Sequence, residues 1–256
     1  MKKGVIPIIL MIVVLILVFL CFLGPWYGFH IKYSEDNSSN NNYFNSSFYN
    51  SEETDTTADY HLTKVSMKGK AFGNPMSFSY DYSYLKDISE KMGTSKTSQF
   101  EKMMSIFDIV FYIVIACIIV SIIGLIFTLG ILVPSKYFLT FKKLGVIFGI
   151  IVFILAIICS FYFMVEWNNL IQETESTELS MISSSQFPTD LGDTGFWYSY
   201  NKNNFEYSLG PGYAWYLIII TGVISLISSI LLYLTREPVL SQFIQPRYTS
   251  VYPPIQ

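Results

Sequence analysis

Residues 5–23 read VIPIILMIVVLILVFLCFL, a stretch without one charged side chain, and similar apolar stretches follow at 106–133, 144–165 and 213–234. Each stretch holds about 19 residues or more. A helix of that length, rising 1.5 Å per residue, covers the roughly 30 Å of hydrocarbon in a bilayer. Because hydrocarbon offers the backbone no hydrogen-bond partner, such stretches are expected to be helical. The sequence therefore predicts an α-helical membrane protein built on a four-helix transmembrane bundle.

The overall composition argues against a soluble fold. Apolar residues make up 52% of the chain and charged residues only 14%, whereas a soluble domain carries roughly 25% charged residues. Lys2 and Lys3 before the first stretch would also suit a signal peptide, but that stretch exceeds the usual apolar region of about 7–15 residues. The boundary Cys21-Phe22-Leu23 also lacks the small residues of a cleavage site, so we interpret the stretch as a retained helix.

Lysine and arginine residues orient the chain, because the positively charged loops of a multi-pass protein face the cytoplasm. One side, the N-terminus with the short loop and the tail, holds seven basic residues and one acidic residue. The two long loops on the other side hold nine basic and 17 acidic residues. We therefore expect both termini to be cytoplasmic, the long loops to be extracellular, and the plasma membrane to be the location. The predicted segments are helix 1–23, extracellular loop 24–105, helix 106–133, basic cytoplasmic loop 134–143, helix 144–165, extracellular loop 166–210, helix 211–234 and cytoplasmic tail 235–256.

The two long loops contain the β-pattern of the chain. From Met76 to Tyr84, aromatic or apolar residues alternate with serine and aspartate, which is the period of a half-buried strand. Together with a weaker alternation before the turn residues at 73–75, this predicts a β-hairpin over 58–85. A similar pattern predicts a second hairpin over 196–209, and residues 26–33 would add a strand. We expect both loops to build one small extracellular antiparallel sheet, because a lone hairpin is marginal in water.

Two further segments carry candidate modification or sorting signals. The segment 34–57 is rich in Asn, Ser, Glu, Asp and Thr, cannot bury enough apolar surface to offset its ordering entropy, and is predicted to be disordered. Within it, Asn37 and Asn45 each begin an Asn-Ser-Ser glycosylation pattern. In the tail, Tyr248 and Val251 match the Tyr-x-x-bulky pattern of an endocytic sorting signal.

Small residues recur every four positions inside the third and fourth apolar stretches, which places them on one helix face. The third stretch carries Gly145 and Gly149, and the fourth carries Thr221, Ser225 and Ser229. Small residues let helix backbones approach closely. These five residues are therefore predicted to pack helix against helix within the bundle, with a seam between two copies of the chain as the alternative.

No sequence pattern indicates an active site, a cofactor site or a metal site. The chain has no Gly-x-Ser-x-Gly element, no Gly-rich phosphate loop and no Cys-x-x-Cys pair, and we interpret His30 and His61 as surface histidines. Asp108 is the only charged residue within the four stretches. It lies near the start of its stretch, where it is expected to cap the helix or to reach the aqueous surface. The lack of charge deeper in the stretches argues against a coupled transporter, and we expect no enzymatic activity.

The layout resembles that of the claudin-like tetraspan proteins. The resemblance covers the whole chain and rests on four helices with both ends inside, a larger first outer loop, and the element Gly24-Pro25-Trp26 where the first helix ends. It implies one outer sheet shared by both loops. The chain departs from claudins because it lacks the cysteine pair of their first outer loop, since Cys21, Cys117 and Cys159 all lie in apolar stretches. It also lacks the Cys-Cys-Gly motif of tetraspanins.

These patterns together predict a structural role in the membrane: adhesion, barrier formation or the scaffolding of partners. The expected partners are the lipid bilayer and other membrane proteins or further copies of the chain, without nucleic acid and without a cofactor. The alternative is a channel or transporter subunit. In that case hydroxyl side chains would line a path between the helices, and the candidates are Ser121, Thr128, Ser160, Thr221, Ser225 and Ser229.

Overall fold

The computed structural model describes residues 5–33, 54–71, 74–92, 97–132, 137–182, 196–202 and 205–235. Its helices are α1 (Val5–Leu23), α2 (Tyr82–Met92), α3 (Thr97–Gly130), α4 (Phe138–Ile182) and α5 (Tyr213–Leu234). Its strands are β1 (Tyr27–Tyr33), β2 (Thr54–Tyr60), β3 (Lys64–Ala71), β4 (Asn74–Asp81), β5 (Tyr198–Lys202) and β6 (Phe205–Pro211).

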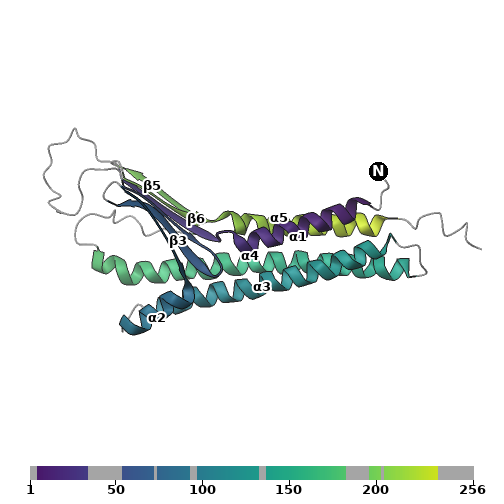
Figure 1. Ribbon diagram of the computed structural model, residues 1–256, viewed down its shortest axis with the longest axis horizontal. Coiled ribbons are helices and arrows are strands. Elements are labelled where there is room, and N and C mark those ends of the chain that lie inside the picture. Colours follow the sequence, from purple (N-terminus) through teal and green to yellow (C-terminus); the bar gives the residue numbers. More distant parts are fainter. Residues whose placement is uncertain are drawn as a thin grey trace, which may run out of the picture.

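Helices α1, α3, α4 and α5 lie side by side along the long axis of the molecule (Figure 1). α1 packs against α3 and α5, and α4 packs against the same two helices. All four are long and apolar enough to cross a membrane, which confirms the prediction of four apolar helices. At the sheet end of the bundle, α3 and α4 extend beyond their apolar stretches: α3 begins at Thr97, ahead of Ile106, and α4 continues past Val165 to Ile182.

The bundle has an apolar surface and a partly polar interior. Large aliphatic side chains are exposed on all four helices, for example Ile16 on α1 and Ile126 on α3. Hydroxyl side chains such as Ser121, Ser225 and Ser228 are almost fully buried. A water-soluble bundle shows the reverse distribution, with its polar residues outside. The observed distribution is the one expected of helices that face hydrocarbon.

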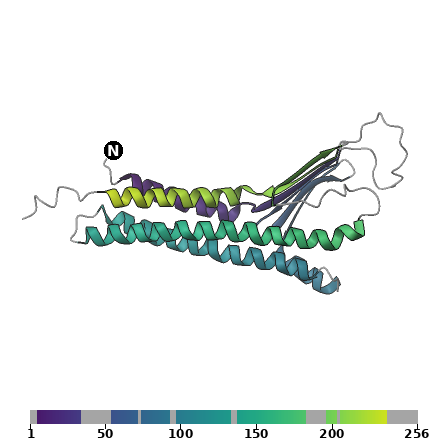
Figure 2. The ribbon, with the colours of Figure 1, turned by 180° about the vertical axis from the view of Figure 1, so that it is seen from behind.

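The six strands form one antiparallel sheet in the order β4-β3-β2-β1-β6-β5. β1 follows α1 after a short connection, and β6 leads through Gly212 into α5, so two neighbouring strands grow out of two neighbouring helices. Tyr27 pairs with Pro211 at the bundle end of these strands, and Tyr33 pairs with Phe205 at the far end. Strands from the two long loops therefore share one sheet, as predicted. Figure 2 shows this sheet continuing from α1 and α5 and slanting away from α4.

The strands lie within or beside the segments expected from the sequence. β5 and β6 occupy the hairpin segment 196–209, and β3 and β4 occupy most of the segment 58–85. One expectation needs correction, because Thr54–Thr57 belongs to β2 and not to the disordered segment. Pairing with β1 holds these polar residues in the sheet, with Thr57 opposite His30. The rest of that segment, residues 34–53, lies outside the described residues.

The expectation that the aromatic strand continues to Tyr84 is also wrong. β4 ends at Asp81, which lies opposite Lys64, the first residue of β3. No further β3 residue remains for pairing, so the backbone needs other hydrogen-bond partners. The Tyr82 N–H donates to the Thr63 carbonyl at 3.2 Å, and from Tyr82 on the chain continues as α2.

Candidate interaction surface

The sheet has two chemically different faces. Residues directly opposite each other in an antiparallel pair share a face. The pairs Phe29↔Ala58, Ala58↔Met67 and Met67↔Phe78 therefore carry one apolar row from β1 to β4. The alternate positions carry charged and hydroxyl side chains, such as Lys68 on β3. We call the first side the apolar face and the second side the polar face.

The end of the apolar face nearest the bundle packs against α3 and α4 through a cluster of rings. The rings of Tyr27 and Trp167 have centres 4.8 Å apart, and those of Tyr60 and Phe107 have centres 6.4 Å apart. Sheet and bundle thus share one continuous hydrophobic core. We call this cluster the aromatic junction; its residues are Trp26, Tyr27, Tyr60, Tyr82, Phe107, Phe163, Trp167, Phe196 and Trp215.

Trp26 joins α1, the sheet and the start of α5. Its side chain is fully buried, and its indole Nε1–H donates a hydrogen bond to the Cys21 carbonyl oxygen at 2.9 Å. Its backbone N–H donates to the Tyr60 carbonyl at 2.7 Å, and its own carbonyl accepts from the Gly212 N–H at 2.9 Å. A Cβ at Gly212 would overlap the Pro25 carbonyl, so only glycine allows this close backbone approach. These contacts fix the orientation of the sheet relative to the helices.

Tyr82 anchors the opposite side of the aromatic junction. Its hydroxyl donates to the His61 carbonyl at 2.8 Å, and its ring centre lies 5.3 Å from that of Phe107. Burial raises the pKa of both Tyr60 and Tyr82 above the ordinary value of 10.0, because a buried phenolate loses its hydration. The neighbouring Tyr60 further raises the pKa of Tyr82. Both phenols are therefore neutral at physiological pH.

Farther from the bundle, the apolar face is uncovered on β3, β4 and the first turn of α2. Phe78 is 43% exposed and Tyr84 is 53% exposed. The rings of Phe78, Tyr80 and Tyr84 stack in a row, with successive ring centres 6.2 and 5.8 Å apart and planes within 10° of parallel. We call this surface the aromatic patch; its residues are Met67, Met76, Phe78, Tyr80 and Tyr84.

The aromatic patch lies on an edge of the sheet. β4 is the last strand in the strand order, so the outer backbone groups of this strand have no strand partner within the described part of the chain. An edge strand can accept a further strand from another polypeptide, and exposed apolar side chains beside it add contact area. The aromatic patch therefore combines exposed apolar side chains with a strand edge that has no strand partner among the described residues.

The predicted packing residues of α4 and α5 meet in the bundle around Gly149. The Ser225 hydroxyl donates to the Gly149 carbonyl at 2.8 Å, and a Cβ on Gly149 would overlap the Ser229 hydroxyl oxygen. Ser229 donates in turn to the Ser225 carbonyl at 2.9 Å. The two helices therefore approach closely at this glycine, with no room for a larger side chain.

The remaining packing residues occupy the same region of the bundle. A Cβ on Gly145 would lie 2.7 Å from the Leu232 side chain of α5, so this glycine also faces α5. Thr221 is buried and donates to a carbonyl of its own helix. The sequence pattern missed Ser228, whose hydroxyl donates to the Pro7 carbonyl of α1 at 3.0 Å. The sequence signal for Ser228 was its position three residues after Ser225, which places it on a neighbouring part of the same helix face.

The charged and histidine candidates lie at the sheet end of the bundle. Asp108 is exposed, but the expectation that it caps a helix is wrong, because α3 begins at Thr97. His30 lies 2.8 Å from the Asp55 carboxylate across β1 and β2, and His61 contacts a backbone carbonyl through Nδ1 at 3.1 Å. Among the described residues, no three His, Cys, Asp or Glu side chains come together as a possible metal site.

Four candidate residues, Asn37, Asn45, Tyr248 and Val251, lie outside the described residues. No protein-family model matches the sequence, and no curated protein is significantly similar to it. Four apolar helices and a small sheet are compatible with a tetraspan arrangement.

Proposed function

We propose that this chain is a multi-pass protein of the plasma membrane that binds neighbouring membrane proteins, or further copies of itself, through the aromatic patch of an extracellular sheet. Its role in this proposal is structural, as an adhesion or scaffolding component with a claudin-like layout, and it catalyses no reaction. The observation that carries the proposal is the row of stacked rings that runs from the edge strand β4 onto the first turn of α2.

The surface and charge of the bundle support insertion into a membrane. Exposed aliphatic side chains surround the four helices, and Lys142 and Lys143 in the first turns of α4 lie at the end opposite the sheet. At that end the Lys142 ammonium donates to the Thr235 carbonyl at 2.8 Å and lies 5.5 Å from the centre of the Tyr233 ring. Lysine and tyrosine are common at membrane–water interfaces, and lysine concentrates on the cytoplasmic side. This arrangement supports a cytoplasmic position for the basic end and an extracellular position for the sheet.

Burial of apolar surface would drive partner binding at the aromatic patch. Complete burial of a Phe or Met side chain stabilises by about 1.5–3 kcal/mol relative to full exposure. Phe78, at 43% exposed, would therefore contribute roughly 1 kcal/mol when a partner covers it. Met76 and Tyr84 are exposed to a similar extent, so the patch as a whole could contribute several such increments.

The proposed orientation also assigns the two short sequence signals. Asn37 and Asn45 would lie outside the cell and carry N-linked glycans, whereas Tyr248 and Val251 would lie in the cytoplasm within reach of sorting proteins. Treatment of the full chain from cells with an N-glycosidase should increase its electrophoretic mobility. The doubly substituted Asn37→Gln, Asn45→Gln chain should not change its mobility after the same treatment.

The test of partner binding changes one face of β4 at a time. Met76→Ser combined with Phe78→Ser removes apolar surface from the aromatic patch, and Ser77→Ala changes the position between them on the polar face. Tagged full-length chains are expressed in cells, cross-linked with an impermeant reagent and purified. We expect the first variant to lose its cross-linked neighbours and the Ser77→Ala control to keep them. Deletion of 58–85 is less informative, because it would remove buried residues of the aromatic junction.

Retention of the same cross-linked neighbours by the Met76→Ser, Phe78→Ser variant would refute the proposal. Surface biotinylation checks that this variant reaches the plasma membrane in normal amounts. Tryptophan fluorescence of the purified chain checks that the aromatic junction, which contains three tryptophans, is intact.

The channel or transporter alternative requires hydroxyl groups that face a hydrated path. In the described bundle, the hydroxyls of Thr128, Ser160 and Ser229 donate to backbone carbonyls at 2.7–2.9 Å, and these side chains are at most 3% exposed. These bonds occupy the hydroxyl donors, and burial keeps the three side chains out of contact with solvent. The structural role therefore has the better support.

A further inference from the structure

The backbone of β4 bonds to β3 on one side and forms an edge of the sheet on the other. Tyr82 and Thr63 continue the register of these two strands, and the Tyr82 N–H donates to the Thr63 carbonyl. In an antiparallel pair, residues that exchange hydrogen bonds alternate with residues whose backbone groups point away from the partner strand. Even-numbered residues of β4 therefore bond to β3, and the N–H and C=O groups of Ser77, Ser79 and Asp81 point outward.

The neighbouring residues follow the same alternation. The His61 N–H donates to the Lys64 carbonyl, so even-numbered residues of β3 bond to β2 and odd-numbered residues bond to β4. Pro75, which has no N–H to offer, falls at an outward position, where an edge strand tolerates proline. The segment Met76–Tyr80 carries neither a charge nor a proline, the two common devices that block an edge. The middle of this edge is therefore open to another strand within the described part of the chain.

A second copy of β4 is complementary to this edge when the two strands run antiparallel with Phe78 opposite the partner's Phe78. Ser77 then lies opposite the partner's Ser79, so the outward backbone groups of both copies meet, and each such pair exchanges two hydrogen bonds. Asp81 lies opposite the partner's Pro75, whose carbonyl can accept from the Asp81 N–H.

The two nearest registers that keep the faces of the sheet matched are poorer. A shift of two residues in one direction places Ser79 opposite the partner's Pro75, which cannot donate in return. A shift in the other direction places Met76 opposite the partner's Tyr82, which is buried and belongs to α2. Only the register centred on Phe78 pairs all of the exposed strand.

The side chains of both faces also match in this register. On the apolar face, Phe78 meets its own copy at a closely spaced position, and Met76 lies opposite the partner's Tyr80; aromatic cross-strand pairs of this kind stabilise sheets. On the polar face, Asp81 is the only charged residue of β4. It lies opposite the partner's Pro75, which in its own sheet is paired with Lys70. The contact thus sets no like charges directly opposite each other and brings each carboxylate toward a lysine.

We infer that the aromatic patch binds a second copy of this chain by antiparallel pairing of the two β4 strands, with Phe78 opposite Phe78. The contact is two-fold symmetric, so the same edge of both copies is used and the assembly closes at two chains. The two sheets join into one, and their apolar rows become continuous across the contact. This inference rests on the proposed function, because it names the partner of the aromatic patch.

Cysteines at the two serine positions test the register. Full-length chains with Ser77→Cys and with Ser79→Cys, each with its own tag, are co-expressed, and their membranes are reduced, washed and oxidised with copper phenanthroline. Opposite residues of a hydrogen-bonded pair have Cα atoms about 5.5 Å apart, within disulfide range, whereas identical positions of the two copies would lie about 8 Å apart, beyond it. We expect a disulfide-linked dimer that carries both tags. Either variant expressed alone with both tags should lose this dimer, and the native cysteines are buried.

A proline at position 79 tests the backbone pairing without a crosslink. Ser79→Pro removes an outward N–H and leaves the hydrogen bonds to β3 in place, whereas Ser79→Ala removes the same hydroxyl and keeps the N–H. Two tagged forms of each variant are co-expressed, and one form is purified through its tag. We expect Ser79→Pro to lose the co-purified second form and Ser79→Ala to keep it. Tryptophan fluorescence checks that both variants retain the aromatic junction.

Absence of the mixed disulfide, equal crosslinking of Ser77→Cys expressed alone, or self-association of Ser79→Pro equal to that of Ser79→Ala would overturn the inference. The Met76→Ser, Phe78→Ser variant tests the proposed function separately. If that variant loses its cross-linked neighbours while the Ser77→Cys and Ser79→Cys chains form no disulfide, the aromatic patch binds a different protein, and only the inference of a second copy is wrong.

Discussion

The contact between Gly149 of α4 and Ser229 of α5 provides a quantitative test of how the bundle packs. In Gly149→Ala, the new Cβ would overlap the Ser229 hydroxyl oxygen. The hydroxyl would have to rotate away and lose its hydrogen bond to the Ser225 carbonyl, which is 2.9 Å long. The substitution therefore changes a helix–helix contact and a hydrogen bond at the same time.

The expected magnitude follows from opposing effects. Alanine stabilises a helix interior over glycine by about 0.5–1 kcal/mol. An extra methyl group forced into a well-packed contact costs about 1–3 kcal/mol, and the lost hydrogen bond costs about 0.5–1.5 kcal/mol. We expect Gly149→Ala to lower the free energy of unfolding by about 1–3 kcal/mol.

Removal of the Ser229 hydroxyl should abolish this cost. The Cβ of an alanine at Gly149 would then meet the Ser229 Cβ at 3.4 Å, which is an ordinary contact. The double variant Gly149→Ala, Ser229→Ala should therefore be at least as stable as Ser229→Ala alone, with a coupling of about 1–3 kcal/mol between the two changes. Unfolding with dodecyl sulfate in mixed micelles, followed by tryptophan fluorescence, measures all four chains. Additive effects of the two substitutions, or a Gly149→Ala chain as stable as the unsubstituted one, would refute this packing.

The aromatic junction allows two further predictions. Trp26→Phe should destabilise the chain by about 1–3 kcal/mol more than Trp167→Phe in the same unfolding assay. The reason is that the Trp26 indole donates a hydrogen bond, whereas the buried Trp167 indole N–H has no hydrogen-bond partner among the described residues. Equal losses would contradict this. Because burial raises the pKa of Tyr60 and Tyr82, their neutral forms favour the folded state, so stability should persist up to about pH 10 and fall as the pH rises further. At pH 7 the free energy of unfolding of Tyr82→Phe should be about 0.5–1.5 kcal/mol lower than that of the unsubstituted chain. Between pH 8 and pH 11 it should fall less than that of the unsubstituted chain, measured by unfolding at each pH. An equal fall in both chains would contradict the role of the buried Tyr82 phenol.

The apolar helices and the aromatic strands could be predicted from the sequence because both rest on local patterns. Nineteen apolar residues from Val5 to Leu23 specify a helix by length and composition alone. The alternation of Met76, Phe78 and Tyr80 specifies a strand with one apolar face. Neither inference required knowledge of which segments pack together.

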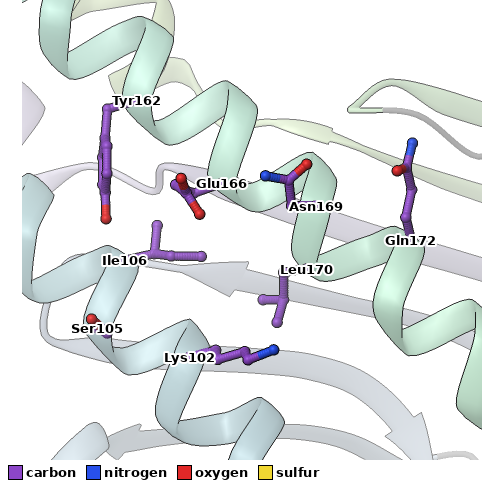
Figure 3. A pocket seen from close by; sticks show the side chains of 8 residues that line it. All are labelled: Lys102, Ser105, Ile106, Tyr162, Glu166, Asn169, Leu170 and Gln172. Atoms are coloured by element: carbon purple, nitrogen blue, oxygen red, sulfur yellow. The ribbon is translucent and has the colours of Figure 1, made fainter.

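The remaining features depend on tertiary contacts that no local pattern encodes. Thr54–Thr57 has the composition of a loop, yet it is a strand because β1 pairs with it. The aromatic alternation does not reveal which rings become buried, since that depends on where the sheet meets α3 and α4. Tyr60 packs on Phe107, whereas Phe78 lies beyond the reach of the helices and is exposed. The pocket between α3 and α4 in Figure 3 likewise joins residues far apart in the sequence, such as Lys102 and Glu166.

Cysteine labelling in intact cells tests most directly whether the sheet lies outside the cell and the opposite end of the bundle inside. The native cysteines are buried and free, so an impermeant maleimide reports on an introduced thiol. Ser77→Cys places that thiol on the polar face of β4, and Thr140→Cys places it near the start of α4, both at exposed positions. The proposed orientation predicts labelling of Ser77→Cys in intact cells and of Thr140→Cys only after permeabilisation. Labelling of both positions in intact cells, or of Thr140→Cys alone, would contradict it.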